Sequence, residues 1–302
     1  MSEKSTAATP AEPVNKRAGQ RPPWLKVRVP GHLDRLPVSE LIGDLDLNTV
    51  CQEARCPNIF ECWAAGTATF MILGDICTRR CTFCAVGRGT PREVEQDEPE
   101  RVALAVHRMA VKHAVITMVN RDDLSDGGAE IVARTVEAVR EKTGAAVEVL
   151  ISDLEGNREA LSKIIAARPE ILAHNVETVP DLYSQVRPVA KYQQSLDILR
   201  WASEDRFEGM LTKSSIMLGL GENEEQIMDV AADLLETGVD IFTMGQYLAP
   251  SEQNHPVRRY YSPDEFDDLG VRARKLGFRH VESGPLVRSS YMAHRAVESI
   301  AD

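Results

Sequence analysis

Six short apolar runs recur along the chain from residue 68 onward, and helix-like stretches separate them. They cover residues 68–73, 113–119, 147–153, 171–177, 213–219 and 241–247. Runs that are apolar at nearly every position are typical of parallel strands buried on both faces. Strands that alternate with helices predict a parallel sheet with right-handed crossovers. The pattern alone leaves two architectures open, an open doubly wound sheet and a partial barrel.

Two of the intervening helices carry clear boundary signals. The residue pairs with capping-box spacing are Asn223 with Gln226 and Ser262 with Glu265. A polar residue followed three positions later by Glu or Gln predicts a helix start, because each side chain satisfies the other's free backbone N–H. Glycines at 238 and 277 predict where these helices end.

The chain outside the alternating region divides into three parts. Residues 1–23 are rich in Ala, Pro and Ser, lack an apolar signal core and include Glu3 and Glu12, which a transit peptide tends to avoid. We expect a disordered tail on a cytoplasmic protein. Residues 24–66 form an irregular N-terminal extension, 67–250 hold the strand and helix pattern, and 251–302 form a C-terminal extension.

Composition excludes two classes of function. The 302 residues are 43% apolar, which is ample for a buried core, and no apolar stretch approaches the roughly 18 residues of a membrane helix. The formal net charge of −11 argues against binding to nucleic-acid backbones, which depends on clustered Lys and Arg. We therefore expect a protein that binds neither membranes nor nucleic acid.

All six cysteines lie between positions 51 and 84. Disulfides need an oxidising compartment, and no export signal is visible, so metal binding or thiol chemistry is the expected use. The cysteines form two triplets, Cys51-Cys56-Cys62 and Cys77-Cys81-Cys84. Each triplet is one ligand short of the four that structural zinc and cubane iron–sulfur sites usually take.

The second triplet, in CTRRCTFC, follows the first predicted strand directly. Its spacing suits a tight loop around a cluster or a stripe along a helix, and the preceding Gly74-Asp75 favours the loop. Three thiolates hold three irons of a [4Fe–4S] cube and leave the fourth iron open to another ligand. A structural zinc site is the alternative reading.

Polar residues end the other predicted strands, where chemistry collects in both candidate architectures. They are Asn120 to Asp123, Asp153, Asn175, Glu177, Gly219 to Glu222 and Gln246. Because parallel strands share one carboxyl edge, the sequence predicts a site at that edge, next to the cysteine loop.

The CxxxCxxC motif, with Phe83 before its last cysteine, resembles the radical S-adenosylmethionine enzymes. That resemblance implies a partial (β/α)6 TIM-type barrel with N-terminal and C-terminal extensions. It implies a [4Fe–4S] cluster on Cys77, Cys81 and Cys84, whose open iron binds S-adenosylmethionine, and a 5′-deoxyadenosyl radical made from that cofactor. Phe83 matches the residue that packs near the adenine.

Further motifs are similar to those of the lipoyl synthase family within these enzymes. They include CQEARCPNIFEC, NRDDLSDGGA, HNVETVPDLYSQVRP, MLGLGE, GQYLAPS and SGPLVRSSY. The resemblance implies a second [4Fe–4S] cluster on Cys51, Cys56 and Cys62, with a serine oxygen of the Arg-Ser-Ser-Tyr motif as fourth ligand. We assign that ligand to Ser289, with Ser290 as the alternative. Alkoxide is a hard ligand among soft sulfurs, which suits a cluster that is dismantled.

The reaction implied is insertion of two sulfur atoms at C6 and C8 of an octanoyl chain on a carrier lysine, with the second cluster as sulfur donor. The carrier is a 2-oxoacid dehydrogenase E2 domain or a glycine cleavage H protein, and a reductant protein and an iron–sulfur assembly protein are further partners. The residues expected to contact S-adenosylmethionine are Phe83, Asp122, Asn175, Glu177, Arg187 and Glu222, with Asp123 beside Asp122 in organising the loop.

Some residue groups have an ordinary reading. His113 and His174 lie on apolar strands, where a satisfied core histidine is expected. Arg79, Arg80, Arg88 and Arg92 form a basic cluster whose usual reading is a solvated face, with docking of an acidic carrier domain as the alternative. Two other functions also remain open at this point, a different radical sulfur insertion or methylthiolation, and a non-enzymatic iron–sulfur carrier.

Overall fold

The computed structural model describes residues 21–26, 37–64 and 68–290. The tail expected over residues 1–23 therefore falls almost wholly outside the described residues. Within the described part, no helix combines the length and the apolar character needed to cross a membrane.

Strands and helices alternate along the described chain, as the apolar runs predict. The strands are β1 (Asn48–Thr49), β2 (Thr69–Ile72), β3 (Ile76–Cys77), β4 (Gly87–Arg88), β5 (His113–Met118), β6 (Ala146–Leu150), β7 (Ile171–Ala173), β8 (Leu211–Leu218), β9 (Ile241–Gln246) and β10 (His280–Gly284). The helices are α1 (Pro37–Asp44), α2 (Val50–Glu53), α3 (Ile59–Ala64), α4 (Glu98–Met109), α5 (Ala129–Thr143), α6 (Arg158–Ala166), α7 (Tyr183–Val186), α8 (Tyr192–Glu204), α9 (Glu224–Glu236) and α10 (Pro263–Leu276).

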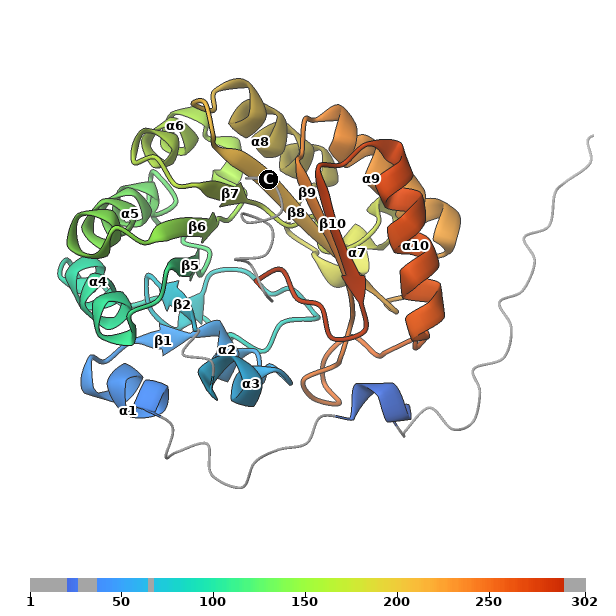
Figure 1. Ribbon diagram of the computed structural model, residues 1–302, viewed down its shortest axis with the longest axis horizontal. Coiled ribbons are helices and arrows are strands. Elements are labelled where there is room, and N and C mark those ends of the chain that lie inside the picture. Colours follow the sequence, from blue (N-terminus) through green and yellow to red (C-terminus); the bar gives the residue numbers. More distant parts are fainter. Residues whose placement is uncertain (1–20, 27–36, 65–67, 291–302) are drawn as a thin grey trace, which may run out of the picture.

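One sheet joins eight of the strands in the order β1-β2-β5-β6-β7-β8-β9-β10. Only β1 runs antiparallel to its neighbour, and every later pair in the sheet is parallel. Figure 1 shows these strands as an arc with α4, α5, α6, α8, α9 and α10 along its outer side. The architecture is the partial α/β barrel that the resemblance implies, and all six predicted strands are present.

The sequence pattern did not predict β10. This strand pairs in parallel with β9 from His280 to Gly284 and so extends the sheet beyond the six expected units. Its composition explains the omission, because HVESG contains one strongly apolar residue and a charged one. The strand is therefore stabilised by its pairing with β9 and by the packing of α10 rather than by an apolar pattern of its own.

Both predicted capping boxes form. Asn223 accepts from the backbone N–H of Gln226 at the start of α9, and the Gln226 side chain accepts from Asn223 in return. Ser262 and Glu265 do the same at the start of α10. Each such cap is worth about 1 kcal/mol. The helices pack on the sheet through two buried apolar clusters, one under β2, β5 and β6 and one under β8 and β9.

Candidate active site

A cavity of about 470 Å³ opens at the carboxyl ends of the sheet strands. Its walls come from the ends of β2 and β5 to β9, from the loop after β3, from the N-terminal segment around α2 and from the residues after β10. These segments are far apart in sequence. The cavity thus lies where parallel α/β folds gather their chemistry.

Five of the six cysteines line this cavity. Cys51 and Cys56 line it from the N-terminal side, and Cys77 at the end of β3 lines it together with Cys81 and Cys84 of the loop that follows. Cys62 stands outside the lining, but it is close enough to Cys51 and Cys56 for their charges to raise its pKa. The loop carrying Cys81 and Cys84 is not helical, as Gly74-Asp75 predicts.

The thiols are held in an environment that favours their neutral form. Burial is the main cause that raises the pKa of Cys62 to about 12 and that of Cys84 to about 11, with neighbouring cysteines adding to it. Burial also raises the pKa of Cys51 and Cys81. Thiols that cannot easily ionise alone are ready to exchange their protons for metal, because the metal charge stabilises the thiolates.

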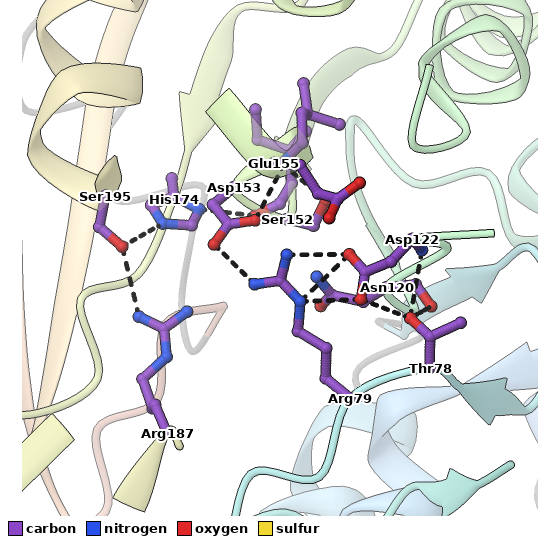
Figure 2. Close-up of polar contacts among 12 residues, drawn as sticks. Thr78, Arg79, Asn120, Asp122, Ser152, Asp153, Glu155, His174, Arg187 and Ser195 are labelled. Atoms are coloured by element: carbon purple, nitrogen blue, oxygen red, sulfur yellow. Dashed lines mark hydrogen bonds and ion pairs between the residues drawn. The ribbon is translucent and has the colours of Figure 1, made fainter. Parts of the chain in front are cut away.

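Arg79, inside the CTRRCTFC loop, is buried and forms the centre of an ion-pair network (Figure 2). Its Nε and Nη2 donate to Asp122, with an Nη2–Oδ1 distance of 2.8 Å, and its Nη1 donates to Asp153 at 2.6 Å. The neighbouring Thr78 hydroxyl also donates to Asp122, at 2.8 Å. These bonds tie the cysteine loop to the ends of β5 and β6.

The solvated reading of the basic cluster is therefore wrong for Arg79, while Arg80, Arg88 and Arg92 are exposed. Asp153 lies next to the buried guanidinium, and although burial alone would raise its pKa, the bond and charge of Arg79 lower it. Both partners are thus charged in the folded protein. Arg79 cannot dock a carrier domain, because its side chain is only 5% exposed.

A second polar group lies on the β7 side of the cavity. Asn175, Glu177 and Arg187 all line it. The Asn175 amide donates to Glu177 Oε1 at 3.0 Å, and Arg187 Nη1 donates to the Asn175 carbonyl at 3.0 Å. Two buried atoms of this group, Asn175 Oδ1 and Arg187 Nε, have no hydrogen-bond partner within the described structure. Unpaired buried polar atoms at a cavity wall are available to bond a polar ligand or water.

Glu177 has two unusual properties for a carboxylate. Burial raises its pKa, although Arg187 opposes the shift. Its φ of 67° lies in the left-handed region, which a residue with a side chain seldom adopts and which tends to occur at functional sites. The fold therefore holds this carboxylate at the cavity against both an electrostatic and a conformational cost.

His174 is linked to Arg187 through the Ser195 hydroxyl, as Figure 2 shows. Its Nδ1 lies 3.0 Å from the Ile151 carbonyl and its Nε2 lies 2.9 Å from the Ser195 hydroxyl. Arg187 Nη1 also reaches Ser195, at 3.5 Å. His174 is thus the satisfied core histidine that the sequence predicts.

The neutral state of His174 predicts a pH dependence of stability. Burial, helped by the charge of Arg187, lowers its pKa from 6.5 to about 4. Below pH 6.5 the imidazole of His174 binds a proton in the unfolded chain but stays neutral in the folded chain. The stability that depends on this residue is therefore fully present above pH 6.5 and falls as the pH decreases. We expect this residue to contribute a loss of about 2 kcal/mol between about pH 7.5 and about pH 5. Urea unfolding of wild type and of His174→Gln at both pH values measures it; equal pH dependence in the two proteins contradicts it.

Two residues expected at the cofactor stand away from the cavity lining. Asp122 is occupied by Arg79 and Thr78, and Glu222 accepts the backbone N–H groups of Gly219, Leu220 and Gly221. Their carboxylates organise the loops after β5 and β8. Phe83, in contrast, lines the cavity and packs beside Val186, Leu220 and Tyr247. Asp123 pairs with Arg121 at 2.8 Å and also organises its own loop.

The residues after β10 reach the cavity from the edge of the sheet that lies farthest from β1 and β2. Figure 1 shows this part of the chain turning into the open middle of the arc. Ser289 and Ser290 both line the cavity, and the Ser290 oxygen accepts from Thr69 at 3.0 Å.

Comparison with known proteins identifies the family of this chain. The Radical SAM superfamily matches residues 71–234. The lipoyl synthase of Rubrobacter xylanophilus is 56% identical over 92% of this chain and 87% of its own length. That of Chloroflexus aggregans is 51% identical over 91% of this chain and 90% of its own length. The chain belongs to the lipoyl synthase family.

This lipoyl synthase family member is therefore a radical S-adenosylmethionine enzyme that inserts sulfur. That membership decides between the alternatives that the sequence left open. Solved structures agree on the fold. Methylornithine synthase (PylB) has a TM-score of 0.50 at 14% identity, covering 83% of each chain, and Streptococcus suis SuiB bound to S-adenosylmethionine has a TM-score of 0.55 at 12% identity, covering 74% of this chain and 54% of its own.

Membership of the Radical SAM family implies a [4Fe–4S] cluster and S-adenosylmethionine for this chain. Among the residues that the structure describes, no three Cys, His, Asp or Glu side chains form a group able to hold one metal ion. A cube takes one thiolate on each of its irons, so its ligands stand apart around a common volume. The triplet lining one wall of the cavity fits that demand, and the unpaired atoms of Asn175 and Arg187 fit a polar cofactor beside it.

Sequence reasoning missed several residues that shape this site. It did not predict the pairing of Arg79 with Asp153, nor the contacts of Asn58, Thr69 and Gly245 with the serine-bearing segment. A signal existed for Gly245, because an isolated glycine inside a strand often marks a close approach of another backbone.

Proposed function

We propose that this enzyme converts an octanoyl group, amide-linked to a lysine of a carrier domain, into the lipoyl dithiolane. Sulfur replaces one hydrogen at C6 and one at C8, and the two sulfurs join. The carrier would be a 2-oxoacid dehydrogenase E2 domain or a glycine cleavage H protein. The observation that carries the proposal is that five of the six cysteines, drawn from two triplets that are each one ligand short, line one cavity.

Two [4Fe–4S] clusters would be held there. Cys77, Cys81 and Cys84 would bind the first and leave an iron open for S-adenosylmethionine, and Cys51, Cys56 and Cys62 with Ser289 would bind the second. Ser289 is favoured over Ser290, because the Ser290 oxygen already accepts the Thr69 hydroxyl. When bound, the first cluster and S-adenosylmethionine would supply a 5′-deoxyadenosyl radical for hydrogen abstraction, and the second cluster would supply the sulfur.

The protein groups around the first triplet would position S-adenosylmethionine. Arg187, with its unpaired Nε, suits a carboxylate or ribose oxygen, and Asn175 and Glu177 suit hydroxyl or amino donors. Phe83 offers an apolar face for the adenine. Asp122 and Glu222 would contribute indirectly, by fixing the loops that carry the neighbouring groups.

The remaining walls of the cavity suit an alkyl chain. Its apolar lining residues include Val50, Met71, Val86, Met118, Leu150, Ile216, Met217 and Leu248. Such walls exclude water and hold an unactivated chain near a radical source, which limits side reactions. A chain of flexible methylenes gains its orientation only from this kind of enclosure.

The partners follow from the chemistry. Cluster reduction requires a reductant protein, and rebuilding a consumed cluster requires an iron–sulfur assembly protein. We place the reaction in the cytoplasm, a reducing compartment that keeps thiols available. The six cysteines, all free in the structure, support that placement.

The test is anaerobic reconstitution followed by incubation with an octanoyl-lysyl peptide, S-adenosylmethionine and a strong reductant. The peptide mass should rise by two sulfurs less two hydrogens, and two deoxyadenosine molecules should accumulate for each product formed. A peptide without the cofactor or without reductant serves as the control. Deoxyadenosine without any sulfur on the peptide would overturn the proposed outcome and leave the radical class intact.

A further inference from the structure

The segment that carries the Arg-Ser-Ser motif, residues 286–290, is called here the serine segment. It follows β10 through a tight turn in which the Val287 N–H donates to the Gly284 carbonyl at 3.1 Å. The turn brings Val287 against Gly245 near the end of β9, and residues 287–290 line the cavity. A short irregular segment at this position stays in place only if other parts of the fold hold it.

Gly245, in the last part of β9, lets the backbone of the serine segment approach this strand closely. A Cβ atom at this position would stand 2.1 Å from the Val287 carbonyl oxygen and 3.0 Å from its carbon. Both are backbone atoms, so a rotamer change cannot relieve the overlap. The serine segment therefore crosses β9 at a distance that only glycine permits.

Asn58 ties the serine segment to the first cysteine triplet. It lies between Cys56 and Cys62, is only 2% exposed, and donates its side-chain amide to the Leu286 carbonyl at 2.8 Å. The backbone carbonyl of Asn58 accepts from the backbone N–H of Cys62 at 3.0 Å. One residue thus links the backbone of the triplet to the start of the serine segment.

Thr69, at the start of β2, makes the third tie. Its hydroxyl donates to Ser290 at 3.0 Å, and its backbone forms a hydrogen bond with the Cys51 thiol. The Arg288 guanidinium between these ends is close enough to Cys56 for their charges to interact. The serine segment is therefore hydrogen-bonded near both of its ends, by Asn58 at Leu286 and by Thr69 at Ser290. Each of these two residues also bonds a cysteine of the first triplet.

We propose that Asn58, Thr69 and Gly245 are positioning residues that seat the serine segment against Cys51, Cys56 and Cys62 before any cluster is bound. The inference rests on the proposed function for its consequence, since a seated serine would complete the ligand set without an ordering cost at cluster assembly. A ligand that is already in place also allows a weak hard–soft bond to persist long enough to be useful.

Hydrogen exchange of the cluster-free full-length chain is the direct test. In Gly245→Ala the amides of residues 284–290 should exchange about tenfold faster or more than in wild type. The matched control is Gly43→Ala in α1, where nothing lies within 4 Å of the added Cβ, and there the exchange should not change. Unchanged protection of residues 284–290 in Gly245→Ala would overturn the proposal.

Thr69→Val tests the same idea without touching β9, because it keeps the side-chain shape and the backbone bond to Cys51 while removing the hydroxyl. Asn58→Asp removes the donor to Leu286. Each should speed exchange in the serine segment, and the double variant should show less than the sum of the two effects in free energy, because both loosen one segment. If Gly245→Ala fails to fold, the Thr69→Val and Asn58→Asp variants test the proposal by themselves. Wild-type protection of the serine segment in both variants would overturn the positioning role.

Cluster loading gives the second readout. After reconstitution we expect the variants to hold about four irons per chain where wild type holds about eight, with the loss confined to the second cluster. Deoxyadenosine formation should continue. If wild type itself loads a single cluster, the proposed function fails, yet the exchange result still stands; if the variants load both clusters with an unprotected segment, the positioning role in assembly fails and the proposed function survives.

Discussion

Replacing Cys51, Cys56 and Cys62 together by alanine is expected to reduce sulfur insertion to background while deoxyadenosine still forms. The reason is that Cys51 and Cys56 line one wall of the cavity and Cys77, Cys81 and Cys84 line another, and only the second triplet would hold the cluster that acts on S-adenosylmethionine. Iron content should fall from about eight to about four atoms per chain. Peptide mass spectrometry and deoxyadenosine assays on the same reaction measure both outcomes.

The matched control is the alanine variant of Cys77, Cys81 and Cys84. It should lose deoxyadenosine as well as sulfur insertion, because it removes the radical source rather than the sulfur source. Lipoyl product from the Cys51, Cys56 and Cys62 variant would contradict the assignment of that triplet to the donor cluster.

Arg79→Met is expected to lower the free energy of unfolding of the cluster-free protein by about 3–5 kcal/mol. The substitution keeps an apolar stem but leaves Asp153, whose side chain is fully buried, without its cation, and it frees the loop of Cys77 from the ends of β5 and β6. Urea unfolding measures the stability, and iron content after reconstitution should show impaired loading of the first cluster.

Arg80→Met, at the adjacent position, is the matched control. Arg80 is exposed, so its replacement should change stability by no more than about 0.5 kcal/mol. Adding Asp153→Asn to Arg79→Met should restore part of the loss, because it removes the unpaired buried charge. Equal stability of the Arg79 and Arg80 variants would show that the ion-pair network does not hold the loop.

Much of the fold could be predicted because strands buried on both faces of the sheet are apolar at nearly every position in the sequence. Val147 and Val149 of β6 are fully buried, as are Ile216 and Leu218 of β8, and their apolar runs identify parallel strands. Capping boxes are equally visible, since their two partners stand three residues apart. The strand β10 could not be recognised in this way, because its neighbours in the sheet rather than its own residues make it a strand.

The site divides along the same line. Cysteine spacing and the Arg-Ser-Ser motif are local patterns, and they predicted which segments surround the cavity. The prediction that Asp122 and Glu222 touch the cofactor depended on where their side chains point, which a pattern does not carry. Glu222 turns to its own backbone amides, and Asp122 turns to Arg79. The contacts with S-adenosylmethionine stay predictions for all six residues: Phe83, Asp122, Asn175, Glu177, Arg187 and Glu222.

By itself the sequence determined the strand and helix order, the two incomplete thiol sets and the family, because all of these are written in spacings between neighbouring residues. Only the tertiary structure decided that Arg79 is buried while Arg80 is exposed, and that Gly245 makes room for Val287. The physical reason is that ion pairing and close backbone approach depend on distances between segments far apart in the chain. Those distances exist only once the sheet has brought β2, β9 and the cysteine segments to one edge.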